Sequence, residues 1–272
     1  MRVFITGSDG FIGKNLYKYL IDRNYEVAGW DYSSGVIPDI EGFDAVVHLG
    51  AISSTTERDI EKIMVQNFEF SMLLLQRCIE TGTNFHYASS ASVYGSNQDF
   101  REDAPLSPQS PYAWSKYLFD RAVNKNINDF PISVTGFRYF NVYGDGEEHK
   151  GDQASPVTKF TRQANETGKV KLFNNSEQCL RDFVWVGDVC EAHEKFLHKS
   201  ARGVYNIGTG KATSFESIAK SICNKYDAEI EYIEMPEALK NQYQYYTCAD
   251  LTKLNEVINM RWHTVQEYLY SK

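Results

Sequence analysis

RVFITGSDGFIGKNL, residues 2–16, is the stretch that decides the fold, because a short apolar run, a glycine-rich turn and a helical pattern follow one another without interruption. Residues 2–6 form a β-like run that stops at a glycine turn. From residue 11 onward the apolar side chains recur at the spacing of one helix face. The stretch therefore predicts a strand, a turn and a helix in that order.

Three glycines, Gly7, Gly10 and Gly13, mark this turn. Glycines there let the backbone turn tightly and let a pyrophosphate approach the N–H groups of a helix N-terminus, where the helix dipole favours anions. Asp31 stands at the end of the next predicted strand, 18 positions after Gly13, where its carboxylate can accept hydrogen bonds from the hydroxyls of an adenosine ribose. This context favours a dinucleotide site over the alternative, a structural glycine turn with an unrelated aspartate.

Strand-like and helix-like segments continue to alternate along the chain. Strands are expected at 25–30, 44–51, 84–90 and 132–140, and helices at 11–24, 56–82 and 110–126. The run at 44–51 is almost entirely apolar, as in a strand that is buried on both faces of a parallel sheet. The alternation predicts an α/β fold, a Rossmann-type doubly wound parallel sheet with a smaller mixed α/β substrate-binding domain.

The alternation loosens after residue 145, so the smaller domain is expected from there. We assign residues 1–141 and 182–208 to the dinucleotide-binding domain, and residues 142–181 and 209–272 to the substrate-binding domain. The segments 181–189 and 204–210 are both expected to return to the main sheet.

The composition argues against several classes of protein. The chain of 272 residues has a net charge of −8, whereas a nucleic-acid binder needs a basic face. Its five cysteines show no CxxC and no tight spacing, which favours reduced thiols over a disulfide framework or a metal site. The apolar runs fall far short of the roughly 20 residues that a membrane span needs, and the sequence shows no signal peptide. We expect a cytoplasmic homo-oligomer without a nucleic-acid or membrane partner.

The segment YAWSK, residues 112–116, places Tyr112 and Lys116 on one face of a predicted helix. A free tyrosine has a pKa of about 10, so it is a poor base at neutral pH. A neighbouring ammonium and the positive charge of a nicotinamide both favour the phenolate, which helps Tyr112 to exchange a proton with a sugar hydroxyl. Lys116 can also hold the nicotinamide ribose, and Ser90, at the end of a predicted strand, can donate to the same substrate oxygen. Taken alone, this spacing has a surface helix pair as its alternative.

The glycine spacing GxxGxxG, followed by VVHLGA (46–51), YASSASVYG (87–95) and SPYAWSK (110–116), resembles an extended short-chain dehydrogenase/reductase of the nucleotide-sugar epimerase group. The resemblance runs from residue 1 to about residue 255 and implies hydride exchange with NAD or NADP. Nucleotide-sugar 4,6-dehydratases of this group carry an Asp-Glu pair after the strand-end serine or threonine, which they need to eliminate water. Residues 89–95, SSASVYG, hold no carboxylate, so the resemblance implies oxidation and reduction of a carbinol centre without dehydration.

Segments in the rest of the chain narrow the resemblance to the ADP-L-glycero-D-manno-heptose 6-epimerase family. They are SSTTE (53–57), FRYFNVYG (137–144), HKG (149–151), LF (172–173), RDFVWVGDV (181–189), NIGTG (206–210) and YQYYTCADLTKL (243–254). By that resemblance Tyr112 and the loop residue Lys150 are two catalytic bases, and Lys116 and Ser90 complete the catalytic set. Two bases suit a ketone that can receive hydride on either face. One side chain cannot easily exchange a proton with the intermediate in both of its orientations. For Lys150 alone, a solvated loop charge is the alternative.

The resemblance also implies which residues line the two binding sites. The cofactor set is Gly7, Gly10, Phe11, Ile12, Gly13, Asp31, Tyr32, Leu49, Gly50, Ala51, Ser53, Asn67, Tyr112, Lys116, Val142 and Lys150. The substrate set is Ser53, Ser90, Asn141, Asp152, Lys159, Phe173, Asn174, Asn175, Ser176, Arg181 and Tyr243. Residues 150–181 carry six Lys or Arg against three acids, which suits a nucleotide-diphosphate sugar as the partner.

Departures from the family leave the substrate open. After Asp31 the chain has only the short segment 32–43, where the family has a further strand and lysines near the adenosine. The pair Ser8-Asp9 replaces the usual Gly-Ala, and Asp152 stands where a small hydroxyl residue is expected. The alternatives are a UDP- or GDP-hexose epimerase or reductase of the same group, and a non-catalytic NAD(P)-binding regulatory protein.

The same departures bear on the choice of cofactor. The heptose epimerases are associated with NADP, whose 2′-phosphate needs cations near the end of the second strand. No lysine or arginine occurs from Asp31 through Glu57, and Asp31 would repel a phosphate while it can bond a ribose hydroxyl. NAD is therefore expected in preference to NADP, unless Arg2 or Arg58, the nearest cations in the sequence, folds back.

Overall fold

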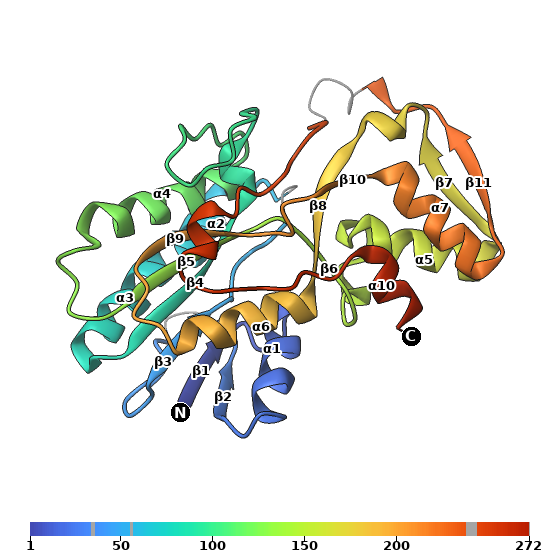
Figure 1. Cartoon of the computed structure of the whole chain (residues 1–272). Coiled ribbons are helices and arrows are strands. Elements are labelled where there is room, and N and C mark those ends of the chain that lie inside the picture. The colour runs from blue at the N-terminus through green and yellow to red at the C-terminus, as the bar shows by residue number, and fades with distance from the viewer. Residues whose placement is uncertain (34–35, 55–56, 238–243, 272) are drawn as a thin grey trace.

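The main part of the molecule is a six-stranded parallel sheet covered on both faces by helices, and a smaller group of strands and helices lies beside it (Figure 1). The computed structural model describes residues 1–33, 36–54, 57–237 and 244–271. The main sheet has the order β2-β1-β3-β4-β5-β9. Its strands are β1 (Arg2–Thr6), β2 (Glu26–Trp30), β3 (Ala45–His48), β4 (Asn84–Ser90), β5 (Val134–Tyr139) and β9 (Gly203–Ile207). All five strand pairs are parallel, which confirms the predicted doubly wound α/β fold.

Side chains that alternate along each strand build a core on each face of the sheet. Val3 and Ile5 of β1 pack with α1 (Phe11–Ile21) and α6 (Val186–Leu197) on one face. Phe4, between them, packs on the other face with α3 (Phe70–Thr81) and α4 (Pro111–Asn126). None of the helices in the described ranges is long and apolar enough to cross a membrane.

The smaller group has its own apolar core, formed by residues such as Phe160, Ile222 and Leu269. It contains a three-stranded sheet of order β10-β8-β6 and a parallel pair of β7 with β11. Its elements are β6 (Asn141–Tyr143), α5 (Pro156–Thr167), β7 (Lys169–Phe173), β8 (Leu180–Trp185), β10 (Ala212–Ser214), α7 (Phe215–Tyr226), β11 (Glu229–Ile233) and α10 (Val265–Tyr270), with α9 (Thr252–Asn255) beside β9. The domain boundaries assigned from the sequence stay a prediction.

One segment pairs differently from the prediction. Residues 204–210 supply β9 to the main sheet as expected, but residues 181–189 do not return to it. The place beside β5 is taken by β9, which pairs with residues 135–139, so β8 pairs with β6 and β10 in the smaller sheet instead. Sequence reasoning assigned both segments to one sheet because both are short apolar runs.

The helix predicted over 56–82 is interrupted by a π-helical turn. It begins as α2 (Ile60–Met64), passes through η1 (Val65–Glu69) and continues as α3, which ends at Gly82 in the left-handed conformation, with φ 71°. The π turn carries the buried Asn67, whose carboxamide accepts from Ile52 N at 2.8 Å and donates to Ile52 O at 3.0 Å. A π turn of this kind frequently marks a functional site, and here it fastens the loop that follows β3.

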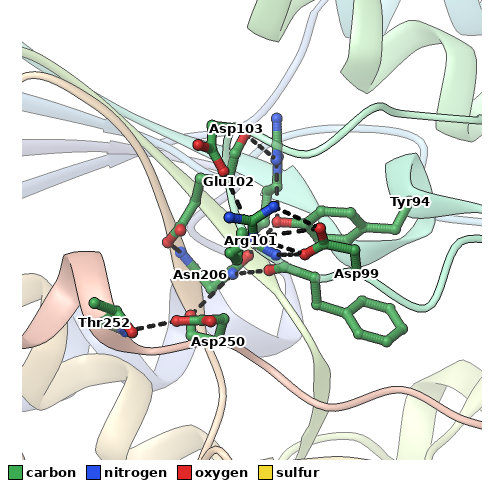
Figure 2. Close-up of polar contacts among 10 residues, drawn as sticks. Tyr94, Asp99, Arg101, Glu102, Asp103, Asn206, Asp250 and Thr252 are labelled. Atoms are coloured by element: carbon green, nitrogen blue, oxygen red, sulfur yellow. Dashed lines mark hydrogen bonds and ion pairs between the residues drawn. The ribbon is translucent and has the colours of Figure 1, made fainter.

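A buried ion pair joins α4 to β4 and β5. The carboxylate of Asp120 accepts from Arg138 Nε, from Ser89 Oγ and from the hydroxyl of Tyr87, each at 3.0 Å. Arg138 also donates to the hydroxyl of Tyr94 at 3.1 Å. Figure 2 shows the outer part of this network, where Tyr94 donates to Asn206 at 2.8 Å and Asn206 donates to Asp250 O at 3.0 Å. The network ties the main sheet to segments that lie far away in the sequence.

Three histidines lie inside the main part, each less than 4% exposed. Burial lowers the pKa of His48 to about 3, with the charge of Lys116 adding to the effect, and lowers the pKa of His86 to about 4. Burial and the neighbouring His86 hold the pKa of His193 well below its usual range. All three rings are therefore neutral in the folded protein at neutral pH.

These histidines predict a loss of stability in mild acid. Their folded-state pKa values lie below the unfolded value of about 6.5, so the unfolded chain binds more protons below that pH. The stabilisation is complete above about pH 6.5 and falls toward pH 4, by about 1.4 kcal/mol per pH unit for each group. The free energy of unfolding, measured with urea at several pH values from 7.5 to 5, tests this prediction.

A His86→Leu variant separates the effect of the buried histidines from that of the buried carboxyls, because it removes one imidazole and changes no carboxyl. His86 Nδ1 has no hydrogen-bond partner within the described residues, so removing this nitrogen breaks no hydrogen bond there. The unfolding free energy of this variant should depend less steeply on pH than that of the wild type. Identical slopes would contradict the prediction.

Candidate functional site

A cavity of about 550 Å³ opens at the carboxyl ends of the main-sheet strands. This is the edge at which doubly wound sheets bind their ligands. Its lining brings together most of the cofactor residues predicted from the sequence, namely Gly7, Gly10, Phe11, Ile12, Gly13, Asp31, Tyr32, Leu49, Gly50, Ala51, Ser53, Tyr112, Lys116 and Lys150.

The glycine loop forms the floor of this cavity and leaves no room for side chains. Gly7 has φ +72°, and a Cβ on it would lie 2.5 Å from Gly50 N in the loop after β3. A Cβ on Gly13 would overlap the carbonyl oxygen of Gly7. These contacts confirm the tight turn that the sequence predicts, and they keep backbone N–H groups exposed at the start of α1, where an anion is favoured.

The Asp31 carboxylate is fixed by the glycine loop itself. Asp31 Oδ2 accepts from Ser8 Oγ at 2.8 Å and from Asp9 N at 3.0 Å. A Cβ on Gly29 would lie 2.6 Å from Ser8 Oγ, so the glycine in β2 makes room for this serine. The pair Ser8-Asp9, which departs from the family pattern, therefore positions Asp31 on the cavity wall. Asp31 Oδ1 receives no hydrogen bond among those described and is the oxygen available to a ribose.

Tyr112, in the first turn of α4, lines the cavity and is partly buried. Burial raises its pKa, and a hydrogen bond with the side chain of Ser90 lowers it. Lys116 Nζ donates to Ala88 O at 2.8 Å. Ser90 also accepts from Ser92 N at 3.2 Å, which holds it beside Tyr112 at the end of β4.

Lys116 is buried in the cavity wall one helical turn beyond Tyr112. Burial lowers its pKa to about 8, and the Asp120 carboxylate one turn further along α4 opposes this shift. Lys116 is therefore still largely protonated at neutral pH, although it is 5% exposed. An ammonium in this position suits the hydroxyls of a ribose bound above it.

Lys150 reaches the cavity from the loop between β6 and α5. It lies in η3 (Glu148–Gln153), and its Nζ is 4.3 Å from the centre of the Phe11 ring, at the start of α1. The same Nζ is 3.3 Å from Glu147 Oε1, and the side chain is 27% exposed. Lys150 is thus held at the mouth of the cavity and is not a loosely solvated loop charge.

Two members of the predicted cofactor set do not line the cavity. Asn67 uses its carboxamide to hold Ile52 and Ser115, and Val142 packs partly buried against the core behind β5. Seven lining residues were not predicted: Ser54, Gln66, Ala88, Ser89, Tyr139, His149 and Gln153. The positions of Ala88, Ser89 and Tyr139 could have predicted their place in the lining, since each lies at or near the carboxyl end of a predicted strand. Gln153 Nε2 donates to Ser54 Oγ at 2.9 Å, a contact between two loops that no local pattern shows.

The predicted substrate residues are mostly spread over the smaller part of the molecule. Lys159 lies on α5, Phe173–Ser176 run from the end of β7 into η4 (Ser176–Gln178), and Arg181 lies on β8. Ser176 and Arg181 are buried, and the Arg181 guanidinium is 5.9 Å from the centre of the Phe215 ring. Asn141 donates to Asp182 O at 3.3 Å. Tyr243 and the side chain of Asp152 lie outside the described residues.

The family model for the NAD dependent epimerase/dehydratase family matches residues 3–208, from β1 through the loop that follows β9. The chain belongs to this family. It is therefore an NAD(P)-dependent enzyme of the nucleotide-sugar epimerase/dehydratase group, and the glycine floor, Asp31 and Lys116 fit that cofactor.

Three solved structures resemble the whole chain. ADP-L-glycero-D-manno-heptose-6-epimerase of Helicobacter pylori is 27% identical, with TM-score 0.86 and 99% of this chain and 94% of that chain covered. UDP-glucose 4-epimerase of Thermotoga maritima, solved with UDP-glucose, is also 27% identical, with TM-score 0.84 and coverage of 99% and 96%. MoeE5 in complex with UDP-glucuronic acid and NAD is 25% identical, with TM-score 0.82 and coverage of 100% and 97%.

The surroundings of Asp31 predict that NAD binds more tightly than NADP, by about 1–2 kcal/mol, the scale of one charge-assisted contact. A 2′-phosphate would face Asp31 and the neighbouring Asp9 with no lysine or arginine between residues 31 and 57. Arg2 cannot relieve this, because it lies at the opposite end of β1, paired with Glu26 at 3.2 Å. Calorimetric titration of both cofactors at one ionic strength measures the difference.

An Asp31→Asn variant is the matched control, because it keeps the shape and an acceptor for Ser8 while it removes the charge. Its preference for NAD should be smaller than that of the wild type. Equal affinities in the wild type, or tighter NADP, would mean that a cation from elsewhere reaches the phosphate.

Proposed function

We propose that this enzyme epimerises a nucleotide-diphosphate sugar by transient oxidation of one carbinol carbon to a ketone, followed by reduction from the opposite face. When bound, NAD would accept a hydride from the carbinol carbon in the oxidation and return it in the reduction. The observation that supports the proposal is that Tyr112, Lys116 and Lys150 line a single cavity, with Ser90 hydrogen-bonded to Tyr112 beside it.

In this proposal Tyr112 takes the hydroxyl proton as the carbinol is oxidised and returns it as the ketone is reduced. Ser90, already hydrogen-bonded to Tyr112, donates to the same substrate oxygen and orients it. Burial alone opposes the phenolate, so the positive charge of the oxidised nicotinamide is needed to bring Tyr112 into its working range. Lys150 serves the epimer whose hydroxyl points to the other side.

The absence of nearby acids favours epimerisation over dehydration. Among the described residues that line the cavity, Asp31 is the single carboxylate, and it lies at the glycine loop. The turn after β4, η2 (Ala91–Tyr94), contains no acid that could remove a proton or protonate a leaving hydroxyl. Elimination of water needs a base at a carbon and an acid at the leaving hydroxyl in addition to the hydride exchange, whereas epimerisation needs only the hydroxyl proton that Tyr112 takes and returns.

We propose an ADP-glycero-manno-heptose as the substrate, by the motifs of the second half of the chain and the likeness to the H. pylori enzyme. A second candidate is a UDP- or GDP-hexose, since the T. maritima UDP-glucose 4-epimerase is equally identical. Incubation with each nucleotide sugar, followed by NMR of the product, decides between them. An epimer formed without net change in NAD supports epimerisation, and stoichiometric loss of reduced cofactor indicates a reductase. Conversion of none of them would overturn both substrate candidates.

Removing the Tyr112 hydroxyl should lower turnover by about 10²-fold or more, as loss of a general acid/base group does. Tyr112→Phe should leave NAD binding nearly unchanged, because the phenyl ring still fills the wall of the cavity. Steady-state turnover and calorimetry measure the two effects. Tyr117→Phe, on the same helix, is the control and should turn over normally. Wild-type turnover in Tyr112→Phe would exclude the assigned role.

Replacing the Lys150 ammonium should also cripple epimerisation. Lys150→Met keeps much of the side-chain length and contact with Phe11 but cannot exchange a proton, and Lys150→Arg should not restore turnover because a guanidinium is not deprotonated in proteins. The measurement is the rate of epimer formation at saturating substrate. Lys169→Met, on the exposed side of β7, is the control for the loss of one positive charge. Normal turnover in Lys150→Met would show that this lysine has no catalytic part.

A further inference from the structure

The carboxylate of Glu147 is buried at the base of the loop that carries Lys150, with 1% of the residue exposed. Four donors converge on it. Oε1 accepts from Ser155 N at 2.8 Å and from Lys150 Nζ at 3.3 Å. Oε2 accepts from Ser155 Oγ and from Thr158 Oγ1, each at 2.7 Å. A carboxyl group at this depth is tolerated because both of its oxygens are hydrogen-bonded.

Two of these partners fix Glu147 to a rigid element. Ser155 is the N-cap of α5, and Thr158 lies in the first turn of that helix, where a negative charge is favoured by the helix dipole. The α5 helix in turn packs into the core of the smaller part through Val157 and Phe160. The position of the Glu147 carboxylate is therefore set by a packed helix and not by the loop.

The remaining partner extends from this anchor to the cavity. Lys150 N donates to Glu147 O at 3.0 Å, and its ammonium bonds the carboxylate of the same residue, so both ends of Lys150 are held by Glu147. Gly151, with φ +54°, then turns the chain away, in a conformation that a side chain would strain. The ammonium is left 4.3 Å from the centre of the Phe11 ring, beside the glycine floor.

Ser155 and Thr158 supply three of the four donors, and the fourth is the Lys150 ammonium, which also lies against the Phe11 ring at the cavity wall. We propose that Glu147 is the positioning residue for Lys150, holding its ammonium at the cavity wall over Phe11 so that it meets the substrate in one geometry. This inference rests on the proposed function, in which Lys150 exchanges a proton with the sugar. Glu147 itself lines no part of the cavity described here, so it acts only through Lys150.

The test is a double-mutant cycle on the full-length enzyme with bound NAD. Glu147→Gln keeps the side-chain size. Its amide has one acceptor oxygen in place of two, so it cannot accept from Ser155 and Thr158 and also attract the Lys150 ammonium. Its kcat should fall by about tenfold to a hundredfold, the scale of a misplaced catalytic group, while KM and NAD affinity stay close to wild type. In the Lys150→Met background the same substitution should cause no further loss, because the group that it positions is already gone.

Thr158→Val is the matched control, because it removes one hydrogen bond to Oε2 without touching Oε1 or the charge. It should lower thermal stability as Glu147→Gln does but leave kcat near wild type. Normal kcat in Glu147→Gln, or losses that multiply in the double variant, would overturn the inference and assign Glu147 to folding alone. Normal turnover in Lys150→Met by itself would instead overturn the proposed role of Lys150, so the two failures are distinguishable.

Discussion

The buried pair of Asp120 and Arg138 is the interaction on which the rest of the site depends. One carboxylate binds α4 to β4 and β5, the elements that supply Tyr112, Lys116, Ser89 and Ser90. Both side chains are 1% exposed, and removing one partner of such a pair costs about 3–5 kcal/mol, because the other charge is left buried and unpaired. Asp120 also keeps Lys116 charged by opposing the effect of burial on its pKa. The Asp120 carboxylate therefore both holds α4 against the sheet and favours the charged form of Lys116.

Local spacing was sufficient to predict several of the residues that line the cavity. The glycine loop, Asp31, Tyr112 and Lys116 are each read from a short segment, and parallel strands bring such segments to one edge without any knowledge of long-range contacts. Lys150 was reached only by resemblance, since its loop has no periodic pattern. Glu147 was missed altogether, because its role depends on donors eight and eleven residues away that a helix N-terminus brings together.

The errors arise where two parts of the chain have the same local pattern. The β8 segment reads as a buried strand whichever sheet it joins, and only the position of β9 decides that it joins the smaller sheet. Asn67 was assigned to the cofactor set by resemblance, and the π turn places its carboxamide against the loop after β3. Both outcomes depend on contacts between distant residues, which periodicity does not encode.

The position of β9 also has a consequence for synthesis of the protein. The sixth strand of the main sheet consists of residues 203–207, so the sheet remains incomplete until the chain has passed through α5, β7, β8 and α6. Asn206 of that strand donates to Phe100 O, so the loop before α4 gains this bond only when residue 206 has been made. Pairing between segments so far apart in sequence is slow to form. A ribosome-bound chain that ends before β9 would therefore expose one edge of a parallel sheet, the form of this protein most prone to join another unfinished chain.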